Sequence, residues 1–198
     1  MHPVIRRPVR RMRIPPLAAF LLVAVWPPAA SATAIPLVNP GFESARPGLH
    51  GSPEGWTALQ HAGEESYDFA LDSGQRKSGT QSLRIKRIGP EPYGTISQVL
   101  GGAQYAGRTV RLSAWIRTKD VPDGRRGGAG LVLMAMRDSA ILAHEFMKRD
   151  RVRGTTDWKR VTIELALPPR TTRLEAGATL EGEGTLWVDD FVLEVVER

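Results

Sequence analysis

The stretch Arg173-Leu174-Glu175-Ala176-Gly177-Ala178-Thr179-Leu180-Glu181 decides the fold class. Apolar residues occupy every second position within it, at 174, 176, 178 and 180. Successive side chains of a β-strand point to opposite faces, so this spacing gathers the apolar residues on one face. The stretch therefore predicts a β-strand with one face in a hydrophobic core.

The same alternation recurs along most of the chain. It is clear in residues 161–167, which read Val-Thr-Ile-Glu-Leu-Ala-Leu, and in residues 110–116. Shorter stretches with strand character are 67–71, 82–88, 95–100, 131–137 and 185–195. Turn signals rich in Gly and Pro separate them, and residues 138–148 read either as a helix or as a strand with a loop. The pattern predicts an all-β fold, an antiparallel β-sandwich or jelly roll.

The first 34 residues have the pattern of a secretory signal peptide. An arginine-rich stretch precedes the apolar run 14–26, and small residues follow, with Ala-x-Ala endings at Ala32 and Ala34. A membrane anchor would need about 20 apolar residues, more than this run offers. We expect cleavage after Ala32 or Ala34, which leaves a single β-sandwich domain in residues 35–198 without a transmembrane anchor. The protein is then exported, to the periplasm or outside the cell.

The net charge belongs largely to this leader. The chain has 27 Lys and Arg against 21 Asp and Glu, a formal charge of +6, but five arginines lie within residues 6–13. Without these five, 22 basic residues face 21 acidic ones. A nearly balanced domain does not suggest a nucleic acid as partner. Local basicity remains at Arg125-Arg126 and in residues 148–153, where an acidic polysaccharide is one candidate ligand.

Three sequence blocks follow one another in a characteristic order. Asn39-Pro40-Gly41-Phe42-Glu43 with Gly55-Trp56 opens the domain, the block 77–85 (Lys-Ser-Gly-Thr-Gln-Ser-Leu-Arg-Ile) follows, and Trp187-Val188-Asp189-Asp190-Phe191 comes near the C-terminus. In this order the blocks resemble carbohydrate-binding modules of families 4 and 9, which have a galactose-binding-like jelly-roll fold. The resemblance covers nearly all of residues 35–198.

The resemblance implies a structural calcium ion between the N- and C-terminal strands. Carried over to this chain, its side-chain ligands would be Glu43 and Asp189, with backbone carbonyls near Gly41 and Gln81. Oxygen ligands of this kind suit a hard cation. Ser78 stands where a related module can offer a carboxylate, so the site has little charge. The alternative is that Glu43 and Asp189 cap strands and tie the two termini together without a metal.

A glycan site needs flat apolar surfaces for pyranose rings and polar groups for hydroxyls. Tyr93, in a Pro/Gly loop before a strand, stands where related modules present a stacking aromatic residue. Trp115 shares a strand face with Arg117 and is turned away from the predicted core, so it either lines a binding face or packs beneath a loop. Arg117 and Gln98 are the predicted hydroxyl partners. The remaining tryptophans (Trp56, Trp158 and Trp187) we interpret as packing residues.

No catalytic motif is evident. The sequence lacks a Gly-x-Ser-x-Gly elbow, a His-Glu-x-x-His zinc motif and a phosphate loop. We therefore expect a non-catalytic binding module for a glycan or cell-envelope polysaccharide. One alternative is a domain that has lost sugar binding and contacts an envelope protein. A second is a jelly-roll polysaccharide lyase or hydrolase, because fold does not fix function.

Overall fold

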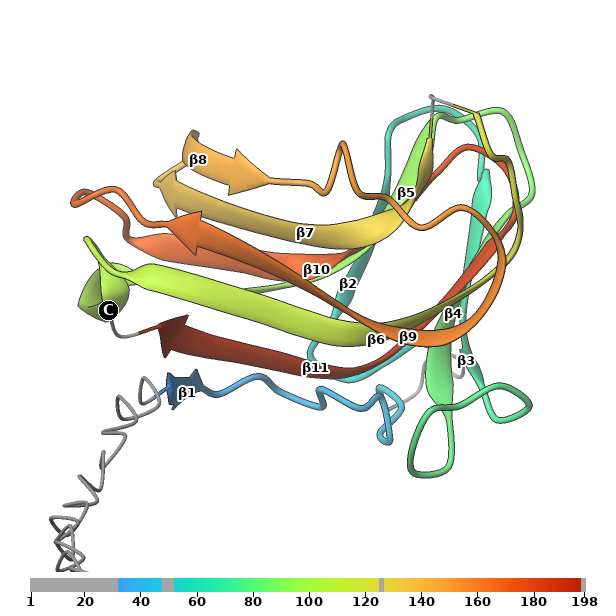
Figure 1. Cartoon of the computed structure of the whole chain (residues 1–198), viewed down its shortest axis with the longest axis horizontal. Helices are drawn as coiled ribbons and strands as arrows, with labels where there is room; N and C mark the ends of the chain where they lie inside the picture. The colour runs from blue at the N-terminus through green and yellow to red at the C-terminus, as the bar shows by residue number, and fades with distance from the viewer. Residues whose placement is uncertain (1–31, 48–51, 125–126, 197–198) are drawn as a thin grey trace, which may run out of the picture.

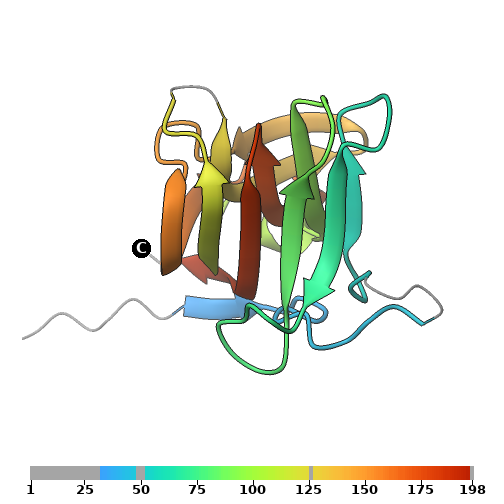
Figure 2. The same cartoon turned by 90° about the vertical axis from the view of Figure 1, so that its right-hand side faces the viewer.

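The computed structural model describes residues 32–47, 52–124 and 127–196, which form two antiparallel sheets packed face to face (Figure 1). One sheet has the strand order β3-β4-β11-β6-β9, and β1 also pairs with β11. Figure 2 shows this order, from β9 in orange to β3 in teal. The other sheet has the order β2-β5-β10-β7-β8. The predicted all-β sandwich is confirmed.

The strands follow one another along the chain with one short 3-10 turn, η1, between β5 and β6. Their bounds are β1 Ala32–Ile35, β2 Thr57–Gln60, β3 Tyr67–Asp72, β4 Ser82–Arg87, β5 Tyr93–Gly101, η1 Ala103–Tyr105, β6 Thr109–Val121, β7 Gly128–Arg137, β8 Ala140–Glu145, β9 Gly154–Ala166, β10 Arg173–Glu181 and β11 Thr185–Val196. Among the described residues, no helix has the length and apolar character needed to cross a membrane.

The core forms between the inner faces of the two sheets. Strand β10 has the bounds that its alternation predicted, and its four inward residues (Leu174, Ala176, Ala178 and Leu180) are completely buried. They pack in one cluster with inward residues of the opposite sheet, such as Leu112 and Leu193. Burial of apolar surface in such a cluster is the main favourable contribution to folding.

Residues 138–148 contain a strand followed by a loop, not a helix. Strand β8 occupies Ala140–Glu145 and pairs with β7. Two further strands, β1 and β2, were not predicted. They are short and lie at sheet edges with mainly exposed side chains, so they show no apolar alternation. Strand β1 includes Ala32–Ala34, the end of the predicted signal peptide; residues 1–31 of that peptide lie outside the described part of the chain.

The residues that carry the family resemblance meet in the core. The ring of Phe42 lies 5.0 Å from that of Trp56, and the Trp56 ring lies 4.8 Å from that of Phe191. All three are buried, so the interpretation of Trp56 as a packing residue is confirmed. Phe42 adopts φ of 59°, a backbone conformation that is rare for a bulky residue. The Asn-Pro-Gly-Phe-Glu block is therefore a tight turn that packs its aromatic ring against Trp56 and against Phe191 of the C-terminal block.

Candidate functional site

The structure does not bring the four predicted ligand-binding residues together. Tyr93 and Gln98 lie on β5, in the five-stranded sheet, whereas Trp115 and Arg117 lie on β6, in the other sheet. The side chains of Trp115 and Arg117 are on the outer face of their sheet, because Ala114 and Ile116 between and beside them are in the core. A single site cannot contain both pairs.

Gln98 is a structural residue in this arrangement. Its side chain is on the inner side of β5 and is 7% exposed. The amide oxygen accepts a hydrogen bond from the Val38 backbone N–H at 2.8 Å, and the amide nitrogen donates to the carbonyls of Val38 and Gly55 at 3.0 and 2.9 Å. Gln98 thus ties the segment before β2 to β5, and its amide is not free to meet a sugar hydroxyl.

The outward residues of β5, β10 and β7 form a surface that we call the outer face, made of Thr95, Ser97, Gly177, Thr179 and Val132. The register places Thr179 beside Thr95 and Gly177 between Ser97 and Val132. Although these residues point away from the core, Thr95, Ser97 and Thr179 are only 8%, 6% and 4% exposed. The flanking Leu59 and Val99 are 56% and 45% exposed, whereas Met147 and Arg151 pack over Gly130 and Gly128 of the adjoining β7 and cover the part of the face beside Thr179.

Gly177 lies in the middle of the outer face, between Ser97 and Val132. A Cβ atom at this position would lie 2.1 Å from the Ile96 carbonyl oxygen and 2.8 Å from the Ser97 Cα. Real Cβ atoms do not approach backbone so closely, so only glycine fits here. The close approach of β10 to β5 leaves the middle of the outer face without a side chain.

Tyr93 stands at one end of the outer face within a group that we call the Tyr93 cluster: Tyr93, His61, Glu91 and Glu181. The rings of His61 and Tyr93 meet edge to face with centroids 5.6 Å apart. His61 Nδ1 lies 2.8 Å from Glu91 Oε2, and Glu181 is the register partner of Tyr93 on β10. Two carboxylates therefore flank the tyrosine ring.

A buried arginine holds one of these carboxylates. The side chain of Arg151 is 3% exposed and its guanidinium donates to Glu181 Oε1. Its Cβ lies where Gly128 leaves room for it, 2.8 Å from the position of a Cβ on that glycine. Two of the four basic residues of the stretch 148–153 are thus structural, because Arg153 also donates to the Arg151 and Gly127 carbonyls, whereas Lys148 and Arg149 are exposed. Arg125-Arg126 lies outside the described residues.

A second aromatic pair flanks the outer face at β8. The rings of His144 and Phe146 stack with centroids 4.6 Å apart and an angle of 22° between them. His144 is the register partner of Met134, an outward residue of β7. The sequence left this segment ambiguous, so the pair was not predicted to bind a ligand; the stacking depends on β8 being a strand.

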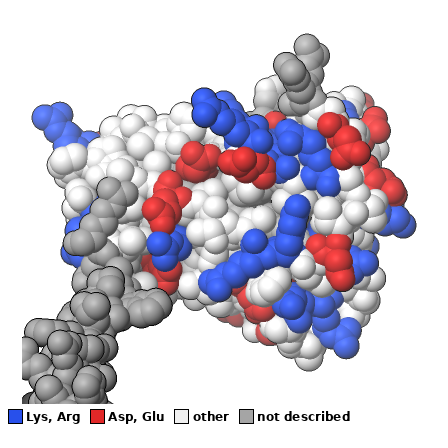
Figure 3. Space-filling model, viewed as in Figure 1, with Lys and Arg blue, Asp and Glu red and all other residues white. Residues whose placement is uncertain are grey.

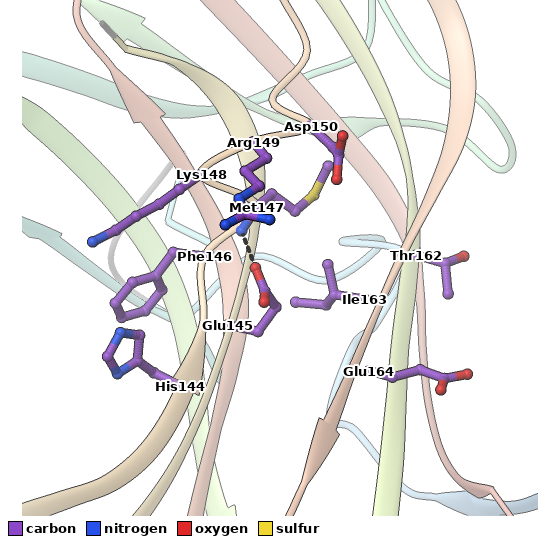
Figure 4. Close-up of a pocket in the computed structure, with 10 residues that line it drawn as sticks. All are labelled: His144, Glu145, Phe146, Met147, Lys148, Arg149, Asp150, Thr162, Ile163 and Glu164. Carbon is purple, nitrogen blue, oxygen red and sulfur yellow. Dashed lines mark hydrogen bonds between the residues drawn. The ribbon is translucent and has the colours of Figure 1, made fainter.

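A cavity of about 510 Å³ opens beside this pair, between β8 and β9. Figure 4 shows Glu145, Met147 and Ile163 pointing towards one another inside it, while His144 and Phe146 project to one side. The Glu145 carboxylate accepts a hydrogen bond from the Met147 N–H at 2.7 Å, which fixes the loop that follows β8. The cavity therefore has an apolar floor of Met147 and Ile163 with a carboxylate at its edge, and it lies at the edge of the sandwich, between the two sheets.

The outer face combines the groups that polyol recognition requires. Aromatic rings stand on both flanks and the carboxylates of Glu91 and Glu181 stand at one end, while the buried hydroxyls of Thr95 and Thr179 hydrogen-bond to each other and to the Gly94 carbonyl. Carboxylates accept hydrogen bonds from sugar hydroxyls, and aromatic faces stack on apolar ring surfaces. The surrounding surface carries basic and acidic side chains intermixed, as Figure 3 shows for the face that contains β8 and β9.

Trp115 and Arg117 lie in a different environment. The Lys77 ammonium sits 4.0 Å above the centroid of the Trp115 ring, so the tryptophan packs beneath the loop that follows β3. Arg117 Nη1 lies 2.8 Å from Asp157 Oδ1. Trp187, on the neighbouring strand β11, is 8% exposed and donates from Nε1 to Asp72 Oδ2 at 2.8 Å, which confirms it as a packing residue. Trp158 is half-buried and lines a separate pocket.

The residues that the family resemblance implies for calcium lie close together. A Cβ at Gly41 would be 3.8 Å from Asp189 Oδ1 and 4.0 Å from Glu43 Cγ. The Glu43 carboxylate accepts hydrogen bonds from the Thr80 N–H and hydroxyl, and Asp189 Oδ2 accepts from the Lys77 and Ser78 N–H groups at 2.9 and 3.2 Å. The Gln81 amide donates to the Phe42 carbonyl at 2.8 Å. The loop 77–81 thus ties the N-terminal turn to β11.

Burial and hydrogen bonding set the charge state of the two carboxylates, Glu43 and Asp189, in this contact between the termini. Asp189 is fully buried, and its burial raises its pKa to about 6, with a further increase from the neighbouring Asp190 carboxylate. The hydrogen bonds from Thr80 hold the pKa of Glu43 below its usual value. Within the described ranges, however, no group of three or more His, Cys, Asp or Glu side chains is arranged to hold a metal ion. A cation held here would therefore depend on backbone carbonyls for most of its ligands.

One curated protein is related in sequence. An uncharacterized HTH-type transcriptional regulator of Bacillus subtilis (strain 168), YbfP, is 30% identical over 153 residues, which cover 73% of this chain. The match spans 49% of the length of the regulator. No model of a known protein family matches the chain.

Several solved structures share the fold. The CBM22-1 xylan-binding domain of Paenibacillus barcinonensis Xyn10C superposes with a TM-score of 0.53 at 14% identity, covering 85% of this chain and 99% of that domain. TmCBM61 in complex with β-1,4-galactotriose gives 0.50 at 18% identity, covering 79% and 95%. A cyclase from Fischerella sp. TAU gives 0.58 at 17% identity, covering 85% and 100%.

These similarities define the class of fold. The chain is a jelly-roll β-sandwich of the kind found in carbohydrate-binding modules, and the same sandwich also occurs in a cyclase. At these identities the likeness extends to the fold alone. The closer assignment to families 4 and 9 stays a prediction, as do the roles of the individual site residues.

Proposed function

We propose that this protein is an exported, non-catalytic module that binds a neutral glycan of the cell envelope on the outer face of the five-stranded sheet. The observation that carries the proposal is the Tyr93 cluster, an aromatic pair with two carboxylates at the end of the outer face. The His144–Phe146 pair at the opposite flank provides a second ring surface for an extended chain.

The fold and the chemistry of the face support this proposal together. Similar sandwiches bind xylan and a galactan fragment, and the carboxylates at Glu91 and Glu181 suit sugar hydroxyls. Glu91 is already bonded to His61, and Glu181 to Arg151, so both carboxylates are held in place before a ligand arrives. Such preorganisation reduces the entropy lost on binding.

A glycan array, followed by calorimetry with the best ligand, tests the proposal. Tyr93→Ala removes the ring and is expected to weaken binding about tenfold, the equivalent of about 1.4 kcal/mol. Tyr93→Phe keeps the ring and should retain most of the affinity. Ile88→Ala, at an exposed apolar residue outside the face, should leave binding unchanged.

The alternatives predict different results. A domain that has lost sugar binding would bind no glycan on the array, and pull-down from envelope extract would recover a protein partner instead. A lyase or hydrolase would release products from the bound polysaccharide. Equal affinity of the wild type and Tyr93→Ala for the glycan would contradict the assignment of the binding face.

Export and the structural calcium ion belong to the same proposal. The arginine-rich leader supports secretion, with a calcium ion held by Glu43 and Asp189 and by carbonyls near Gly41 and Gln81. The ion would supply positive charge beside the buried Asp189 and link the N-terminal turn to β11. Mass spectrometry of the mature protein and calcium titration test these two parts separately.

A further inference from the structure

A second pocket lies on the other sheet of the sandwich. The loop between β3 and β4 lies against outward side chains of β6 and β9 and borders an open pocket of about 400 Å³. Its lining consists of residues 74–79 together with Arg117 and Trp158. Tyr93 and the outer face are on the opposite sheet, so this pocket is separate from the proposed glycan site.

The lining of the pocket is basic and aromatic. It includes Arg76, Lys77 and Arg117, and none of its lining residues is acidic. Trp158 forms one wall, and Lys77 lies over Trp115 beside it. A tryptophan offers a stacking surface for a ring, and cationic side chains offer donors to an anionic group.

The three cations keep donors available for a ligand. Arg76 donates to the Ser73 carbonyl at 2.7 Å, and Lys77 makes its contact with the face of Trp115. Arg117 pairs with Asp157, but the Asp157 side chain is 86% exposed. An ion pair with so exposed a partner contributes little stability. The Asp157 carboxylate therefore occupies the position at Arg117 that a ligand carboxylate would take.

From this arrangement we infer that the pocket binds an acidic sugar unit, with the pyranose ring against Trp158 and its carboxylate on Arg117, in place of Asp157, and on Lys77. The inference rests on the proposed glycan-binding function and adds a second site with its own ligand class. The protein would then contact a neutral glycan through one sheet and a uronate-containing glycan through the other.

Calorimetry with polygalacturonate oligosaccharides on the full chain tests this inference. Arg117→Gln is expected to weaken binding about tenfold, and Lys77→Gln several-fold, because each removes a charge that faces the carboxylate. Asp157→Asn should instead tighten binding about two- to fivefold, because it removes the carboxylate that competes for Arg117 and an exposed ion pair contributes less than about 1 kcal/mol. Lys119→Gln is the matched control, since it removes an exposed charge on the same strand outside the pocket.

The outcomes separate this site from the proposed glycan face. Loss of uronate binding in Arg117→Gln with retention in Tyr93→Ala supports the second site, whether or not a neutral glycan binds. Loss in Tyr93→Ala with retention in Arg117→Gln overturns it, as does weaker binding in Asp157→Asn. Equal binding of inorganic sulfate and of the oligosaccharide would show an anion site without sugar recognition, and would also overturn the inference.

Discussion

At the scale of single residues, Asp189 combines full burial with a raised pKa. In the folded protein its pKa is about 6, against an ordinary value of 3.8, because burial penalises the charged carboxylate. The folded state therefore binds more protons than the unfolded state between these two values. Stability is then expected to fall as the pH rises from about 4 to about 6, and to level off above that range.

This pH dependence can be tested as a property of the contacts that join the N-terminal turn, the loop 77–81 and β11. In the presence of a chelator, we expect the free energy of unfolding to be higher at pH 5 than at pH 7.5, by about 1 kcal/mol, since one pKa unit corresponds to about 1.4 kcal/mol. Calcium should lower the pKa of Asp189 and reduce the difference. Urea denaturation at both pH values measures it, and the same pH profile in Asp189→Asn as in the wild type would contradict the assignment.

Residues also show what the sequence could predict of the site. Tyr93 was predicted from the family resemblance and from its place between Pro92 and Gly94 before a strand, and its role in binding stays a prediction. Glu91 lies in the same Pro/Gly loop as Tyr93, whereas His61 and Glu181 come from distant segments that reach Tyr93 because β5 pairs with both β2 and β10. Strand pairing is not encoded in a local pattern, so the approach of His61 and Glu181 to Tyr93 could not be predicted from the sequence.

At the scale of secondary structure, the success of prediction follows burial. Strand β10 was predicted to its ends because one side of it is completely buried and its apolar residues therefore alternate strictly. Strand β2 was missed because its residues are exposed or half-buried, so no apolar periodicity is required. The prediction for Gln98 failed for a related reason. The sequence shows a polar residue on a strand but not its backbone partners at Val38 and Gly55, which occupy its amide.

Strand β1 begins within the predicted signal peptide, so the site of cleavage would affect the stability of the sandwich. Ala32–Ile35 pairs with Val196–Leu193 at the end of β11, and only Ile35 is buried. A chain that starts at Thr33 keeps most of this pairing, whereas one that starts at Ile35 loses it. Each backbone hydrogen bond contributes about 1 kcal/mol, so the shorter chain should be about 1–2 kcal/mol less stable.

Two purified chains, beginning at Thr33 and at Ile35, allow this comparison by urea denaturation. Amide hydrogen exchange at residues 193–196 provides the local readout, since loss of β1 exposes that edge of β11. Equal stability and equal protection would show that β1 does not contribute to the folded domain. The mass of the mature exported protein then shows which of the two chains the cell produces.

At the scale of the whole molecule, the two proposed sites lie on outward faces of opposite sheets, with the completely buried core between them. Among the described residues, no loop lines both sites: the pocket uses residues 74–79, Arg117 and Trp158, and the Tyr93 cluster uses residues of the other sheet and its loops. Ligands in two sites without common residues are expected to bind with independent free energies.

Saturating the protein with a neutral glycan should therefore change the dissociation constant for uronate oligosaccharides less than twofold. The reverse titration should agree, because coupling free energies are reciprocal.

A polysaccharide that carries both neutral and acidic units could bind to both faces of each protein molecule. The wild-type protein should therefore cross-link such polysaccharide chains, which a rise in light scattering would measure. Either single variant, Tyr93→Ala or Arg117→Gln, should abolish cross-linking while the other ligand still binds. If the two ligands excluded each other, they would share one site. The structure argues against a shared site, because Tyr93 on β5 and Arg117 on β6 lie in different sheets.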